Sequence, residues 1–161
     1  MPSVIGKDFA IYDLNEFPTT VFHSKKDGKP FRNRKIAISP YTTGEPVYLL
    51  ITDKFPTEEK EPIPSKEQFL KTGHTHEFAE EIMIRKHAGL GFTMDGIMFD
   101  LPAGSAFAAK PGCFHANTDN DSTLGNTTLC IFVPPIAADE DANYVELIKQ
   151  TNDYLATVKR V

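Results

Sequence analysis

The stretch "GHTHEFAEEIMIRKHAG", residues 73–89, places two histidines one residue apart and then two glutamates before an apolar run. In an extended chain, residues two apart point to the same side, so His74 and His76 are expected to direct both imidazoles into one space. A helix would instead separate them by about 200° around its axis. The stretch therefore predicts a histidine pair at the start of a strand, which by itself is only a weak sign of a metal site.

Two glutamates, Glu80 and Glu81, are candidates for an acidic ligand beside these histidines. Glu81 directly precedes the apolar run 82–84, and if it faces the histidines, Arg85 shares its face by the period-2 rule for strands. If Glu80 took this place, the isoleucines would line the site and Arg85 would point away. We therefore favour Glu81 and keep Glu80 as the alternative.

Short runs rich in β-branched and aromatic residues recur along the chain, with glycine and proline turns between them. Asp95-Gly96 separates two such runs and is a dipeptide that type I′ hairpins prefer. This pattern favours an all-β antiparallel sandwich or barrel over alternating strands and helices. The expected strands are residues 9–13, 19–23, 34–39, 47–52, 81–86, 90–94, 97–101, 105–109 and 127–133.

Two segments depart from the β pattern. Residues 56–73 are charged and rich in proline, which predicts a long surface loop with one short helix that begins at Ser65. Near the C-terminus, apolar residues recur at steps of three and four from Tyr144 to Val158, which predicts an amphipathic helix over about 140–159. Acidic residues 139–141 before it and basic residues 159–160 after it match the helix dipole. We expect this helix to pack on the outside or the end of the barrel.

Length and composition narrow the class of protein. A chain of 161 residues predicts a single domain spanning 1–161. The net charge of −5 argues against a nucleic-acid or anionic membrane partner, and the apolar runs are too short to cross a bilayer. The N-terminus has no secretory apolar region, and Cys113 and Cys130 are too few for a disulfide scaffold. These features favour a cytoplasmic address.

One basic segment stands out against this acidic background. The stretch "KKDGKPFRNRK", residues 25–35, holds six of the seventeen Lys and Arg residues around an Asp27-Gly28 turn. It can be interpreted as a grip for an anion or phosphate, or as a solvated hairpin. We favour the solvated hairpin, because no aromatic pattern for base stacking accompanies the charge.

A second motif lies downstream, in "GSAFAAKPGCFH", residues 104–115, where His115 follows a Pro111-Gly112 turn. Together, segments 73–89 and 104–119 resemble the two metal motifs of the cupin superfamily. Lys110 departs from the family pattern, which usually has proline there, and Asn117 follows His115 by two residues rather than four. The resemblance implies a single cupin-type double-stranded β-helix, or jelly-roll, barrel with the C-terminal helix added to it.

The resemblance also implies a metal centre made by His74, His76, Glu81 and His115. One divalent transition metal ion is expected there, with iron favoured and manganese, nickel, zinc, cobalt or copper as alternatives. The family implies a metal-dependent enzyme that acts on a small-molecule substrate, and dioxygenase-type oxidative cleavage of an oxygenated metabolite is slightly favoured. The alternatives are a non-oxidative lyase, decarboxylase, isomerase or cyclase, and a non-catalytic small-molecule sensor. Homodimerisation is a further family-based expectation.

Some residues near the motifs have two interpretations. An inward Arg85 should meet an anion, which is a substrate carboxylate or an internal acidic residue, unless its side chain leaves the strand end and reaches water. His87 is either an acid or base on the same face or a solvated histidine, and we favour the latter. Cys113 shares strand parity with His115, although a buried inert thiol is the simpler interpretation. The loop 55–72 leads into the histidines and is a candidate lid.

Overall fold

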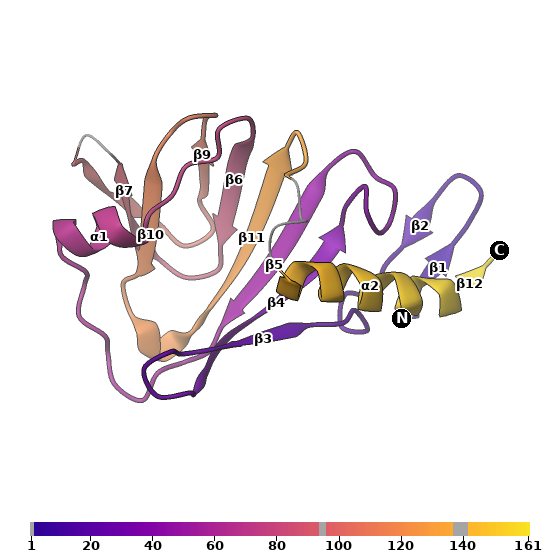
Figure 1. Ribbon diagram of the computed structural model, residues 1–161, viewed down its shortest axis with the longest axis horizontal. Coiled ribbons are helices and arrows are strands. Elements are labelled where there is room, and N and C mark those ends of the chain that lie inside the picture. The colour runs from indigo at the N-terminus through magenta and orange to yellow at the C-terminus, as the bar shows by residue number, and fades with distance from the viewer. Residues whose placement is uncertain (1, 94–95, 137–141) are drawn as a thin grey trace.

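The computed structural model describes residues 2–93, 96–136 and 142–161, with the side chains of 142 and 143 left aside. Two facing antiparallel sheets form a barrel (Figure 1). The larger consists, in spatial order, of β3 (Thr20–His23), β4 (Pro30–Ile38), β5 (Tyr48–Lys54), β11 (Asn126–Val133), β6 (Glu80–Arg85) and β9 (Ala106–Ala109). The smaller consists of β10 (His115–Asp119), β7 (Gly89–Thr93) and β8 (Met98–Leu101).

The predicted all-β architecture is confirmed, and the expected strands match the observed ones apart from shifted ends. Strand β4 begins at Pro30, inside the basic segment, whereas the prediction began it at residue 34. Strand β10 was not predicted, because the sequence "HANTD" lacks the β-branched and aromatic residues that mark strands. The hairpin between β7 and β8 exists, but Asp95 of the predicted Asp95-Gly96 turn lies outside the described residues.

The register of the larger sheet determines which side chains share the barrel interior. Glu81 of β6 is paired with Phe132 of β11, which in turn is paired with Tyr48 of β5. Further along the strands, the next row of the same face joins Met83, Cys130, Leu50 and Ile36. The row after that joins Arg85, Thr128, Thr52 and Arg34. One face of the sheet is therefore acidic at one end, apolar in the middle and basic at the other end.

The helix α1 (Lys66–Thr72) begins where the sequence predicts. The hydroxyl of Ser65 accepts a hydrogen bond from the backbone N–H of Gln68, and the Gln68 side chain accepts one from the Ser65 N–H. This reciprocal capping box satisfies two N–H groups that the first turn leaves free. Phe69 is fully buried and stacks on Phe92 of β7 at 5.3 Å, so α1 is attached to the smaller sheet.

The helix α2 (Ala142–Thr157) covers part of the larger sheet. Its Leu147 belongs to the same buried cluster as Ile36, Leu50 and Cys130. Residues 139–141, which include the predicted start at 140, lie outside the described part; the helix ends at Thr157 rather than at 159, and Lys159 and Arg160 are not helical. These two residues follow the end of the helix and form β12 (Lys159–Arg160), which pairs in parallel with β1 (Val4–Ile5).

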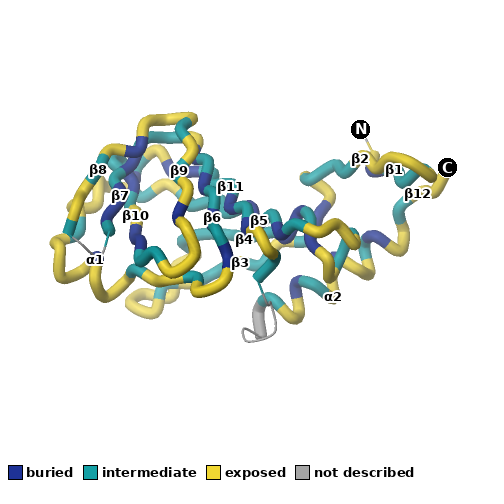
Figure 2. Tube along the Cα trace, turned by 90° about the horizontal axis from the view of Figure 1, so that it is seen from above, coloured by how far each residue is buried: buried dark blue, intermediate teal, exposed yellow. Residues whose placement is uncertain are grey.

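Strand β1 also pairs with β2 (Ala10–Ile11), which completes a small third sheet. Figure 2 shows this sheet and the end of α2 projecting from the barrel, with both chain ends in the projection. No helix in the described part of the chain combines the length and the apolar character that a bilayer crossing requires.

Candidate metal centre

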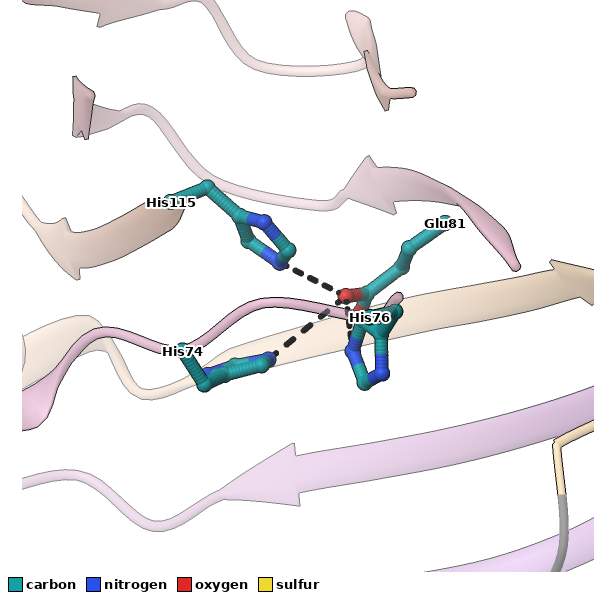
Figure 3. Close-up of side chains that lie close together, drawn as sticks. All are labelled: His74, His76, Glu81 and His115. Carbon is teal, nitrogen blue, oxygen red and sulfur yellow. Dashed lines mark hydrogen bonds and ion pairs between the residues drawn. The ribbon is translucent and has the colours of Figure 1, made fainter. Parts of the chain in front are cut away.

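The side chains of His74, His76, Glu81 and His115 converge on one point inside the barrel (Figure 3). Each offers one ligand atom, and these atoms all lie within 4.8 Å of one another. The Glu81 Oε2 atom lies 2.8 Å from His115 Nε2, 3.0 Å from His76 Nε2 and 3.7 Å from His74 Nε2. The structure thus brings together the four residues that the two motifs single out.

Backbone pairing holds the histidines in this arrangement. His74 and His115 exchange two backbone hydrogen bonds of 3.0 Å, which form an isolated antiparallel bridge at the start of β10. The Gly112 N–H donates to the carbonyl of His76 at 2.9 Å. Gly112 has φ of +79° and follows Pro111, as a type II turn requires, so the departure at Lys110 leaves the turn intact. Each motif therefore fixes the backbone of the other.

The protonation of His115 provides a test of whether the cluster fits a metal ion. Its Nδ1 atom lies 3.0 Å from the carbonyl oxygen of Cys113, and a carbonyl can only accept, so Nδ1 carries a proton. In a neutral imidazole, Nε2 is then an acceptor, yet it faces the Glu81 carboxylate at 2.8 Å. Two acceptors this close require a cation between them, either a proton or a metal ion. Metal-binding histidines commonly donate their second N–H to a carbonyl in this way.

The electrostatics of the ligand-free cluster agree with this geometry. Burial acts to raise the pKa of Glu81, but hydrogen bonds from His115, His74 and His76 outweigh it and hold that pKa well below its usual range. Burial acts to lower the pKa of His115, while the contacts with Glu81 and the Cys113 carbonyl raise it above its ordinary value. Without a metal ion, the site therefore holds an ionised Glu81 against a proton-binding imidazole.

The cluster opens into a cavity of about 1420 Å³ inside the barrel. Such a volume is ample for a small metabolite. The side chain of His115 is 1% exposed, whereas that of His74 is 53% exposed, so solutes reach the cluster from the His74 side. The apolar part of the cavity wall includes Tyr48, Leu50, Met83, Cys130 and Phe132.

Comparison with solved structures agrees with the architecture, although no protein-family model and no curated protein matches the sequence. An uncharacterised conserved protein with a double-stranded β-helix domain from Klebsiella pneumoniae is similar, with 16% identity and a TM-score of 0.51. The match covers 79% of this chain and 86% of that one. This chain has the double-stranded β-helix fold of the cupins.

Two further structures share this fold. The iron(II) form of HppE is 12% identical, with a TM-score of 0.57 over 81% of this chain, which spans 63% of the HppE chain. A protein from Thermotoga maritima described as a predicted oxalate decarboxylase is 13% identical, with a TM-score of 0.55. That match covers 76% of this chain and 96% of the other chain. At these identities, the likeness concerns the fold.

Glu81, rather than Glu80, faces the histidines of this chain. The Glu81 side chain is 5% exposed, whereas Glu80 turns outward and pairs with Lys110 at 2.9 Å. Lys110, which departs from the cupin motif, therefore has a partner of its own. The alternation of faces along β6 explains the difference between the two glutamates.

Arg85 faces the interior and meets an internal acid. Its guanidinium donates to Asp119 and to the Asn117 side chain, the latter at 2.6 Å. Asp119 also pairs with Lys54 at 2.8 Å and accepts from Asn126 at 2.7 Å. The role of Arg85 in binding a substrate carboxylate stays a prediction, and its contacts favour the alternative of an internal partner.

Two other candidates do not reach the site. His87 lies beyond the end of β6, where the alternation of faces no longer holds, and outside the cavity lining. Cys113 lies in the turn before β10, and its backbone carbonyl, rather than its thiol, contacts His115. The candidate lid 55–72 is bonded to η1 (Ser122–Leu124). The Thr57 hydroxyl donates to the Ser122 hydroxyl at 2.7 Å, and the Glu61 backbone N–H donates to the same oxygen at 2.8 Å.

The sequence analysis missed two features of the cavity wall. Cys130 lies beside Glu81, and burial, followed by the nearby carboxylate, raises its pKa to about 12, so the thiol is inert. Arg32 and Arg34 line the cavity from β4, which corrects the interpretation of the basic segment as a wholly solvated hairpin. The predicted turn at Gly28 is present. Period-2 alternation places both arginines on one face but cannot say whether that face is inside.

Proposed function

We propose that this protein is a metal-dependent enzyme that transforms a small, oxygen-rich, carboxylate-bearing metabolite. His74, His76, Glu81 and His115 would bind one divalent transition metal ion, with iron(II) favoured. The observation that carries the proposal is the convergence of three imidazoles and one carboxylate, whose ligand atoms all lie within 4.8 Å of one another. A mixed set of three imidazoles and one carboxylate suits iron, manganese and their neighbours.

The accessibility of the cluster supports catalysis rather than a structural role. A structural metal site is closed, whereas here His74 is half exposed and a cavity adjoins the ligands. When bound, such an ion would supply Lewis acidity or, as iron(II), reactivity toward dioxygen. We favour dioxygenase-type oxidative cleavage, and the shared fold with the iron(II) protein HppE supports this choice.

The residues of the chain itself would orient the substrate and keep water away. Phe132 packs on the His76 ring at 5.0 Å, and the Tyr48 ring lies 6.0 Å from that of Phe132. Burial raises the pKa of Tyr48 well above its ordinary value, so its hydroxyl stays protonated at neutral pH. Tyr48 lines the cavity and would donate a hydrogen bond to a substrate oxygen.

Elemental analysis tests the metal centre. Untagged protein, purified without chelator, is compared with a His76→Ala, His115→Ala double variant by plasma mass spectrometry. The expected result is near-stoichiometric metal that the double variant loses. His87→Ala serves as the control, because it removes a histidine outside the cavity and should leave the metal content unchanged. Protein that holds no metal even after reconstitution would overturn the proposal.

Turnover of hydroxy- and oxo-carboxylic acids tests the reaction class. The reconstituted protein is incubated with each acid while oxygen uptake and products are followed. Oxygen uptake with cleaved product supports the dioxygenase, and product formed under anaerobic conditions indicates a non-oxidative lyase or isomerase instead. Tight binding without any product would identify a sensor and contradict the proposed enzyme.

A further inference from the structure

Two arginines on the cavity wall have no anionic partner among residues 2–93, 96–136 and 142–161, which the structure describes. Arg32 and Arg34 lie two residues apart on β4, and both line the cavity that contains the candidate metal ligands. Their Nε atoms are buried and have no hydrogen-bond partner among the described residues. In the same part of the chain, no carboxylate pairs with either guanidinium. By contrast, Lys54 and Arg85, which line the same cavity, share the Asp119 carboxylate.

Aromatic rings pack against these two guanidiniums but do not provide acceptors for most of their N–H donors. The Phe22 ring lies 4.9 Å from the Arg32 guanidinium carbon and 5.2 Å from that of Arg34. The Tyr144 hydroxyl accepts one hydrogen bond from Arg34. Such rings partly offset a desolvated charge, but they leave most of the N–H donors free. The arrangement is preorganised for an acceptor that the described residues do not supply.

The proximity of the two cations is itself unfavourable. Burial, followed by the charge of Arg34, lowers the pKa of Arg32. A pair of like charges held in a partly buried site costs free energy unless an anion joins them. Binding sites commonly carry such a cost, because the ligand removes it.

We propose that Arg32 and Arg34 form a carboxylate-binding site for the distal end of the substrate, whose proximal oxygens reach the metal centre. This inference rests on the proposed function and specifies its substrate class as a small diacid with a hydroxy or oxo group. A planar guanidinium fork matches a carboxylate, which accepts two parallel hydrogen bonds. Arg85 already pairs with Asp119, so we assign the binding of the substrate carboxylate to the arginines of β4 instead.

The register of the sheet indicates the length of the substrate. Glu81 is level with Tyr48 on β5, whereas Arg34 is level with Thr52. Four residues of a strand span about 13 Å, and the long arginine side chains cover part of this distance. An extended diacid such as 2-hydroxyadipate should therefore bind better than the shorter malate.

Thermal unfolding of the metal-free protein tests the arginine pair independently of the metal. Arg32→Gln and Arg34→Gln are compared with wild type and with Lys7→Gln, which removes an exposed charge outside the cavity. In buffer without multivalent anions, the arginine variants should melt at or above the wild-type Tm. Adipate should raise the Tm of wild type and Lys7→Gln but not that of the arginine variants. Arginine variants that melt lower and still respond to adipate would overturn the inference, as would an equal response to phosphate.

Calorimetry of the metal-loaded protein tests the substrate class. The probes are 2-hydroxyadipate and 2-hydroxyhexanoate, which have the same chain length and differ in the second carboxylate. Wild type should prefer the diacid by about tenfold or more, as a charge-assisted hydrogen bond implies. Arg32→Gln should lose this preference, and Lys7→Gln should keep it. An unchanged preference in Arg32→Gln would overturn the inference. Metal content measured on the same samples distinguishes this failure from that of the metal centre.

Discussion

Arg85 and Asp119 form an ion pair in which the side chains are only 4% and 5% exposed. They come from different sheets, since Arg85 ends β6 and Asp119 ends β10. The second carboxylate oxygen of Asp119 bonds to Lys54 of β5 at 2.8 Å. This pair therefore joins both sheets beneath the cavity and balances charges that would otherwise compete with Arg32 and Arg34 for an anion.

The substitution Asp119→Asn should strongly destabilise the protein. It leaves the buried charge of Arg85 without its anion, and breaking a buried pair by removing one partner costs about 3–5 kcal/mol. Urea unfolding at neutral pH measures the free energy of unfolding. Asp100→Asn is the control, because Asp100 is exposed and its loss should change that free energy by less than about 0.5 kcal/mol. Equal stability of the two variants would contradict the structural role of the pair.

Lowering the pH should selectively remove the stabilisation that the Arg85–Asp119 pair provides. Burial acts to raise the pKa of Asp119, but bonds from Lys54 and Asn126 outweigh it and lower the pKa below the ordinary value of 3.8. A carboxyl with a lowered folded pKa stabilises above its unfolded pKa and loses this effect as pH falls through the folded value. The difference in free energy of unfolding between wild type and Asp119→Asn should thus be constant near neutral pH and shrink below about pH 4. A difference that persists unchanged in acid would assign the stability to another group.

Most of the barrel could be predicted from the sequence because its strands carry a strong local signal. The run 47–52 is β-branched and aliphatic, and β5 forms there with a two-residue extension. Strand β10 has no such signal, since its "HANTD" sequence is polar and is held by pairing with β7. The two-residue strand β12 pairs with β1 near the other end of the chain, and β1 also pairs with β2. Tertiary pairing, rather than propensity, determines these elements.

The candidate site could be predicted where motif spacing sets the geometry. Residues His74 and His76 share one face because they are two apart, and the alternation along β6 turns Glu81 inward. The anionic partner of Arg85 could not be chosen in advance, because Asp119 comes from the opposite sheet. The aromatic neighbours of Arg32 were equally hidden, since Phe22 meets it only through the pairing of β3 with β4.

The two neighbouring glutamates should differ sharply in their effect on metal binding. Glu81→Gln removes the carboxylate at the centre of the histidines, so metal affinity should fall by at least about 10–100-fold, the loss typical even for outer-shell partners. Glu80→Gln removes only a surface pair with Lys110, worth about 0–1 kcal/mol of stability, and should retain full metal content. Metal content after dialysis against a weak chelator measures both. Loss of metal in Glu80→Gln but not in Glu81→Gln would show that Glu80, and not Glu81, is the metal ligand.

A methyl group at Gly89 should disrupt the junction of the two motifs. A Cβ atom there would lie 2.3 Å from the backbone carbonyl oxygen of Thr118 and 2.9 Å from the Arg85 guanidinium. Because the carbonyl belongs to β10, the two strands must separate, and Gly89→Ala should cost about 1–3 kcal/mol in the free energy of unfolding. Gly6→Ala is the matched control, since the three atoms nearest to its Cβ would belong to the Phe9 ring, which is 57% exposed and free to turn away. Urea unfolding of both variants measures the difference, and a Gly89→Ala protein as stable as Gly6→Ala would show that strands β7 and β10 do not approach this closely.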